Sequence, residues 1–243
     1  VERALWGAAA LGVAGAGASA WALRRDAGAR AGKAERGLAA LVRVARRERA
    51  VLIPCLFTFC ERLTVGLLVS SFALYLAQVL GRPPSAIGLL MSLVLFPFAL
   101  LCYPFGRLCR VWRKSVMVAG GSILYGLALG ALAWVPPDWL PAWMVLLGVV
   151  SAVNFAPSLA MVADLAGPDA RSTAMGAFNA AGSLGFLLGP LVGGAVVQWA
   201  SSAGMSPRAV YGLAFLAGGG LTVLTALAAL PPLVRLVRAG RTT

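Results

Sequence analysis

Hydrophobic residues gather along the chain in seven long runs that are separated by short polar breaks. The runs cover residues 4–23, 51–79, 86–106, 116–135, 142–163, 173–199 and 209–230. Each run is long enough to cross the hydrocarbon core of a bilayer, about 30 Å thick, which takes about 20 residues of helix. Because backbone groups cannot stay unpaired in lipid, the pattern predicts an all-α membrane protein with seven transmembrane helices.

The composition supports a lipid environment. The chain is 60% hydrophobic and 12% charged, whereas soluble domains have about 45–50% apolar and about 25% charged residues. The four cysteines lack metal-ligand spacing and the sequence has no histidine, so no metal or other cofactor is expected. An enzyme within the membrane would need a cluster of His, Asp, Glu or Cys at one depth. Only Glu61 lies deep in a run, so no enzyme is expected.

The distribution of basic residues predicts the orientation. Of the 21 Lys and Arg residues, 17 fall in alternate breaks and the C-terminal tail, three fall on the other side, and Arg62 lies within a run. Positive charge collects on the cytoplasmic side of membrane proteins. We therefore expect Val1 outside and the C-terminus in the cytoplasm, in the inner membrane of a bacterium. The basic charge then faces anionic lipid, and nucleic acid is not expected as a partner.

One break is much longer than the others and is strongly basic. Residues 24–50 carry nine Lys and Arg residues, and their apolar residues fall roughly at helical spacing. This pattern predicts an amphipathic helix on the inner membrane surface. It divides the chain into a first helix at 1–23, a cytoplasmic loop at 24–50 and a six-helix unit at 51–243.

A glycine-rich stretch in the sixth run has regular spacing. Residues 185–194 read GFLLGPLVGG, which places Gly185, Gly189 and Gly193 on one helical face and Gly194 beside it. A face of small residues lets another helix approach closely. Pro190 removes a backbone donor and bends the helix. Together they suit a helix that rocks against its neighbour, although a static close-packed interface fits the pattern too.

This stretch resembles the glycine-proline motif of major facilitator superfamily transporters, on the fifth helix of a six-helix half. Residues 106–114, GRLCRVWRK, resemble a degraded copy of the superfamily's loop motif G-x-L-x-D-R-x-G-R-R. Gly106 and Arg113 match, whereas Arg110 replaces the aspartate. The resemblance implies helix 6, the central loop and helices 7–12 of the family fold, with a six-helix N-terminal half as partner. A first half with an extra leading helix is the alternative, which the long basic loop fits less well.

An acid and a base stand side by side within the second run, at Glu61 and Arg62. At 1.5 Å per residue they lie roughly 16 Å from the inner end of the helix, near the middle of the membrane. A charge there costs about 2.5–3.5 kcal/mol, so the pair must face protein or water. Neighbours on a helix point in different directions and cannot both face one groove. We expect Glu61 or Arg62 to line a solute cavity, with Glu61 as the candidate proton carrier. A structural charge pair is the alternative.

Seven other residues are candidates for the solute path or for a gate. Asn154 and Asn179 are polar groups inside apolar runs, where they either line a cavity or bond helix to helix. Asp164 and Arg171 lie at the predicted inner membrane face, where pairing with Arg110 or Arg113 would form a cytoplasmic gate that includes Gly106. A solvated loop would explain the same charges.

The predicted function is secondary active transport of a small organic solute by alternating access. The resemblance implies a transporter, and drug-like efflux and proton antiport are the finer expectations. The sequence has no phosphate-binding G-x-x-x-x-G-K-S/T loop, so ATP is not expected to drive transport from this chain. A non-transporting membrane scaffold, or a half-transporter subunit, is the alternative.

Overall fold

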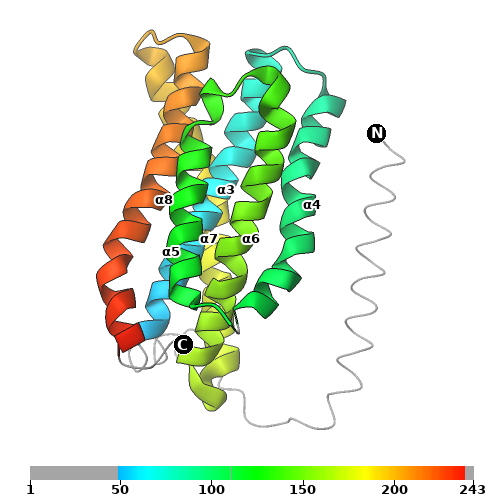
Figure 1. Cartoon of the computed structure of the whole chain (residues 1–243). Coiled ribbons are helices and arrows are strands. Elements are labelled where there is room, and N and C mark those ends of the chain that lie inside the picture. Colours follow the sequence, from blue (N-terminus) through cyan, green and yellow to red (C-terminus); the bar gives the residue numbers. More distant parts are fainter. Residues whose placement is uncertain (1–48, 110, 239–243) are drawn as a thin grey trace, which may run out of the picture. The chain divides into compact units, whose positions relative to one another are not determined.

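The computed structural model describes residues 49–109 and 111–238, which form a bundle of six α-helices (Figure 1). The helices are α3 (Leu52–Gln78), α4 (Pro84–Leu108), α5 (Lys114–Gly130), α6 (Leu140–Leu165), α7 (Gly167–Ser202) and α8 (Pro207–Arg238). Three short 3₁₀ helices at Arg49–Val51, Leu132–Trp134 and Pro137–Trp139 complete the described elements. The predicted first span at 4–23, nearly all of the basic loop and Arg110 lie outside the described residues.

The six helices confirm the predicted all-α membrane fold. Five of them are long and apolar enough to cross a bilayer, and α5 is a shorter apolar helix that the 3₁₀ turn at Leu132–Trp134 extends. Two helix ends differ from the expectation. The loop expected before residue 173 is reduced to a tight turn at Ala166 and Gly167, whose φ of +67° favours glycine. Helix α8 was expected to end near residue 230, but it continues past Pro231 and Pro232 to Arg238. Membrane helices tolerate such prolines.

The helices pack mainly in pairs, and each pair has glycine at the contact between its two helices. Helix α3 packs chiefly on α7, α4 on α6, and α5 on α8. A methyl group added at Gly148 of α6 would collide with the Val94 carbonyl of α4, and one at Gly219 of α8 would collide with the Gly126 carbonyl of α5. Within lipid the hydrophobic effect contributes little to helix association. Close approach of the backbones instead provides the van der Waals packing that holds the helices together.

Two apolar clusters fill the bundle at different depths. One cluster holds Phe72, Tyr75, Leu129, Met144 and Phe215 with their neighbours. The other is centred on residues nearer the opposite helix ends, which are Phe57, Val118, Met161, Phe178 and Ala226. Along α3, α5, α6 and α8, the segments between the clusters carry buried polar side chains. The fold therefore places a polar layer between two apolar ones.

Candidate functional site

The polar layer is built from side chains on four helices. It consists of Thr58, Glu61 and Thr64 on α3, Ser122 on α5, Ser151, Asn154 and Ser158 on α6, and Thr222 on α8, all of which are buried. Several of these hydroxyls bond to the carbonyl of the preceding helical turn, as Thr64 does to Glu61 at 2.8 Å. Buried polar groups without partners are costly, so a layer of this kind in an apolar bundle indicates a functional role.

Glu61 is the acidic residue of this layer. Its side chain is 2% exposed, and the Ser151 hydroxyl donates a hydrogen bond of 2.9 Å to its Oε1 atom. The other oxygen, Oε2, has no hydrogen-bond partner within the described residues, and neither do the Ser122 hydroxyl, the Tyr125 hydroxyl and the Asn154 amide nitrogen. The carboxyl group thus faces α5 and α6, inside the bundle.

Arg62 points in a different direction from Glu61. Its guanidinium carbon lies 4.7 Å from the ring centre of Phe155 on α6 and 5.7 Å from that of Phe98 on α4. Within the part of the chain that the structure describes, it forms no ion pair with Glu61. Cation–π contacts of this length stabilise a partly desolvated guanidinium. The adjacent acid and base therefore occupy different environments, as their helical spacing requires.

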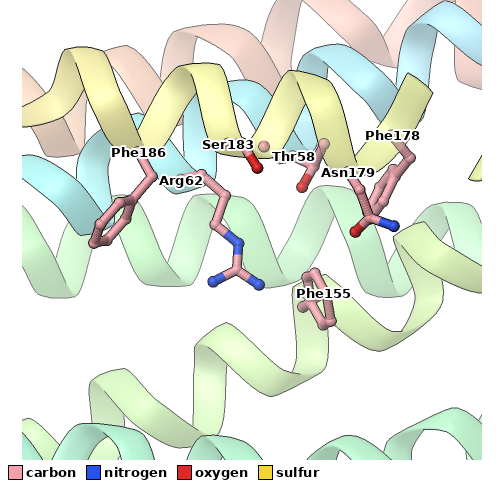
Figure 2. Close-up of a pocket in the computed structure, with 8 residues that line it drawn as sticks. Thr58, Arg62, Phe155, Phe178, Asn179, Ser183 and Phe186 are labelled. Atoms are coloured by element: carbon pink, nitrogen blue, oxygen red, sulfur yellow. The ribbon is translucent and has the colours of Figure 1, made fainter. Parts of the chain in front are cut away.

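Arg62 reaches into a cavity of about 400 Å³ between α3, α6 and α7. Figure 2 shows Arg62 extending from α3 toward Phe155 of α6, with Asn179, Ser183 and Phe186 of α7 around the same space. Thr58, Phe178 and Gly182 complete the lining. Asn179 is exposed, so its amide is available to a ligand. The cavity thus combines one positive charge, hydrogen-bonding groups and aromatic rings.

A second, smaller cavity lies on another side of Arg62. Its volume is about 140 Å³, and apolar residues of α3 and α4, among them Leu68, Met91, Val94 and Phe98, make up most of its lining. Tyr125 and Ser151, which surround Glu61, form part of its wall. Arg62 therefore lines both a cavity with mixed polar and aromatic walls and a mostly apolar one.

The structure brings together some of the expected residues and separates others. Arg62 and Asn179 line one cavity, whereas Glu61 lies in the protein behind it. Asn154 is 1% exposed and packs with its backbone close to Gly121 of α5, so it belongs to neither cavity. Asn154 is separated from the larger cavity because it lies on the side of α6 that packs against α5.

Sequence reasoning missed the aromatic residues and Ser151. Phenylalanines are ordinary residues of an apolar run, so nothing marked Phe98 or Phe155 as neighbours of Arg62. Ser151 did carry a signal. It lies one helical turn before Asn154 on α6, and residues three apart share a helix face.

The glycine-proline stretch forms the contact between α7 and α3. A methyl group at Gly185 would collide with the Phe59 carbonyl, and one at Gly189 with the Leu63 carbonyl. At Gly193 it would meet the Ser71 hydroxyl at 2.8 Å, whereas Gly194 has open space around it. The smooth face of α7 thus lies on the helix that carries Glu61 and Arg62, and Gly194 lies outside the contact.

The residues expected to form a gate make different contacts from those expected. Asp164, at the end of α6, forms an ion pair of 3.0 Å with Lys114 at the start of α5 rather than with Arg113, which is exposed. Arg171 donates a hydrogen bond of 3.3 Å from Nε to the Ala163 carbonyl. Gly106 lies in the last turn of α4 with open space around it. Lys114 replaces Arg113 because it begins the helix that packs on α6.

We expect the ion pair between Asp164 and Lys114 to contribute little to stability. Asp164 is 41% exposed and Lys114 is 14% exposed, and partly exposed pairs contribute less than about 1 kcal/mol. Asp164→Asn and Lys114→Gln should each lower the free energy of unfolding by that amount or less. In a double-mutant cycle, the free energy of unfolding of the double variant should be no lower than that of the less stable single variant. Additive losses would show that the pair has no interaction energy.

These features define a polytopic helical membrane protein with a charged cavity between its helices. Residues 54–241 match the family model described as Major Facilitator Superfamily, so the chain belongs to this superfamily of membrane transporters, as the sequence motifs suggested. A multi-drug resistance efflux pump PmrA homologue of Lactococcus lactis is 33% identical over 114 residues, which is 46% of this chain and 28% of the relative. Human major facilitator superfamily domain-containing protein 10 is 39% identical over 83 residues, which is 33% of this chain and 18% of the relative.

Solved structures show the same fold. A bacterial homologue of the human lysosomal transporter Spinster, inward-facing and unoccupied, superposes with a TM-score of 0.61 at 17% identity, over 79% of this chain and 43% of the other. A peptide transporter, POT, in complex with sulfate gives 0.54 at 21% identity, over 78% and 39%. The chain therefore matches less than half the length of these transporters.

Proposed function

We propose that the protein is a secondary active transporter that moves a small organic solute by alternating access. The observation that carries this proposal is the cavity around Arg62, which opens between α3, α6 and α7 and combines a charge, an amide and aromatic rings. Solute sites near the middle of the membrane, between two repeats, are typical of secondary transporters. Asn179 and Arg62 are then solute-contacting residues.

The six described helices act as one half of the transporter in this proposal. Residues 51–243 are the C-terminal half, the basic segment at 24–50 is the central cytoplasmic loop, and an N-terminal half of six helices closes the cavity from the other side. The position of the glycine-proline stretch on α7, the fifth helix of the half, supports this assignment. The cytoplasmic face then holds Asp164, Arg171 and Lys114 as part of an inner gate, and the host membrane is a bacterial inner membrane.

Proton coupling is assigned to Glu61. A carboxyl group inside the bundle with one unbonded oxygen can take up and release a proton at small structural cost. Its position next to Arg62 on α3 gives a direct route from proton binding to the solute cavity. Export is the proposed direction, because the relative from Lactococcus lactis is named as an efflux pump.

Alternating access can be tested without knowing the solute. In the protein as its complete gene encodes it, every cysteine, including the four of this chain, is replaced by alanine, and a single cysteine is introduced by Asn179→Cys. We expect a membrane-impermeant maleimide to label this position from either side of the membrane, because the cavity opens to each side in turn. Ser172→Cys and Ser202→Cys, near opposite ends of α7, should each be labelled from one side only.

The same experiment separates a transporter from a scaffold. A scaffold has no reason to change access, so labelling of Asn179→Cys from only one side, or from neither, would favour the alternative. The two controls on α7 also report the orientation of the helix, because the cytoplasmic reagent should reach Ser172→Cys.

A further inference from the structure

Arg62 is the residue that the two cavities share among those that line them. Its guanidinium carbon lies 4.7 Å from the ring centre of Phe155, which lines the larger cavity, and 5.7 Å from that of Phe98, which lines the smaller one. A ligand in either cavity would therefore lie next to the same positive charge. What this charge binds determines the class of solute.

The guanidinium group has unused binding capacity. Arginine has five N–H donors in a planar fork, and within the described residues Arg62 contacts aromatic faces but forms no hydrogen bond and no ion pair. Among the described residues, no acidic side chain lines either cavity, and Glu61 is turned toward Ser151. A planar fork with free donors matches a carboxylate or sulfonate group.

The two cavities differ in the groups that they offer beyond Arg62. The smaller one is mostly apolar, with Leu68, Met91 and Phe98 in its wall, and its volume is about 140 Å³. An apolar protein cavity of about 150 Å³ is large enough to bind benzene. The larger one offers the Asn179 amide and the Ser183 hydroxyl. An apolar ring thus fits on one side of the charge and polar groups fit on the other.

We propose that the transported solute is an amphipathic organic anion, whose carboxylate or sulfonate binds Arg62 and whose apolar ring enters the smaller cavity beside Phe98. This inference rests on the proposed transport function and adds the substrate class to it. Polar substituents of the solute would face Asn179 and Ser183 in the larger cavity. Organic cations are disfavoured, because they would place a like charge against the guanidinium group.

Three probes of similar shape and different charge test the substrate class. Binding of 2-naphthoate, 2-naphthylmethanol and 2-naphthylmethylamine is measured by equilibrium dialysis, with the complete protein in nanodiscs of phosphatidylcholine. We expect naphthoate to bind at least about tenfold more tightly than the alcohol or the amine, as a charge-assisted hydrogen bond provides. Arg62→Gln should remove this preference. Arg82→Gln, in the exposed loop after α3, should keep it.

Arg62→Lys protects the test against a folding defect. It keeps the charge but loses the planar fork, so we expect folded protein that binds naphthoate more weakly than the wild type and more tightly than Arg62→Gln. Equal affinity of the wild-type protein for all three probes, or preference for the amine, would overturn the proposal. So would loss of naphthoate binding when one fifth of the nanodisc lipid is phosphatidylglycerol, because the anion at Arg62 would then be a lipid headgroup.

A transport assay separates failure of this inference from failure of the proposed function. In proteoliposomes, counterflow of the neutral or cationic probe without counterflow of naphthoate would overturn the anion assignment and leave the transporter proposal intact. Labelling of Asn179→Cys from one side only, together with no counterflow of any probe, would overturn both. Counterflow of naphthoate that Arg62→Gln abolishes and Arg82→Gln preserves would support both.

Discussion

Gly189→Leu is expected to disrupt the bundle, whereas Gly194→Leu, on the same helix, is expected to leave it folded. At Gly189, even a methyl group would overlap the Leu63 carbonyl and crowd the Leu67 amide of α3. Neither partner can move away, because both belong to a helical backbone. At Gly194, an added methyl group would have no atom of another described helix within 4 Å. The two variants therefore add the same side chain to a crowded site and to an open one.

The expected size of the effect follows from overpacking. Extra methylene groups in a packed core cost about 1–3 kcal/mol, and contact with backbone places Gly189→Leu at or above the upper end of that range. A loss of about 3 kcal/mol would lower Tm by about 6–12 °C in a protein of 150–250 residues. Tryptophan fluorescence of the purified protein during heating would measure this shift. Equal Tm values for Gly189→Leu and Gly194→Leu would contradict the close contact between α3 and α7.

The contact between α3 and α7 also determines the geometry of the site. Arg62 belongs to α3, and Asn179 and Ser183 belong to α7, so the distance between the two helices sets the width of the larger cavity. Gly182 lies at this cavity, and a methyl group there would meet the Arg62 side chain at 3.3 Å. The glycines thus hold the two walls together at the depth where Arg62 lies.

The sequence predicted the helices well because each must present a long apolar run to lipid. It also marked Arg62 and Asn179 as candidates, since a charge and an amide are rare inside such runs, and the structure places both in the lining of one cavity. The partners of these residues were harder to predict. Asn154 and Asn179 have the same side chain, yet one is buried against α5 and the other is exposed in the cavity. Which face of a helix is buried depends on the packing of several helices, and the apolar pattern of a membrane helix, hydrophobic all round, does not encode it.

The differences at the end of the bundle that holds Asp164 and Lys114 have a similar cause. Asp164 pairs with Lys114 because α5 starts beside the end of α6, and this proximity is a result of tertiary packing. The short turn at Gly167 likewise replaced an expected loop, because polar residues such as Asp169 and Arg171 continue the helix instead of interrupting it. Polarity marks the edge of the membrane in a sequence, and a helix can extend beyond that edge.

Glu61→Gln is expected to uncouple transport from the proton gradient without unfolding the protein. Glutamine keeps an oxygen that can accept the hydrogen bond from Ser151, and it fills nearly the same volume. It cannot exchange a proton. Other titratable or charged groups near the carboxyl are Arg62, Tyr125 of α5 and Cys102 of α4. In this proposal none of these groups replaces the carboxyl as proton carrier. Solute transport by Glu61→Gln should therefore be accompanied by no proton exchange.

The expected result is measured in proteoliposomes that hold the complete protein. With one proton exchanged per solute and the membrane potential held at zero, a gradient of one pH unit supports a concentration ratio of about tenfold, because one unit corresponds to about 1.36 kcal/mol. The wild-type protein should approach this ratio, and Glu61→Gln should give a ratio near one. Counterflow, which needs no proton, should continue in the variant. Ser151→Ala removes the hydrogen bond but leaves the acid, so its ratio should stay well above one.

These readouts distinguish a proton carrier from a structural acid. If Glu61 only stabilised the bundle, Glu61→Gln and Ser151→Ala would both have a lower Tm than the wild-type protein. Their counterflow would then fall together with their gradient-driven transport. A proton carrier instead separates the two activities in Glu61→Gln alone. If this variant still reached a tenfold ratio, the coupling proton would bind elsewhere. The unbonded oxygen of Glu61 would then serve the hydrogen bonding of the polar layer, where the Ser122 and Tyr125 hydroxyls also lack partners within the described residues.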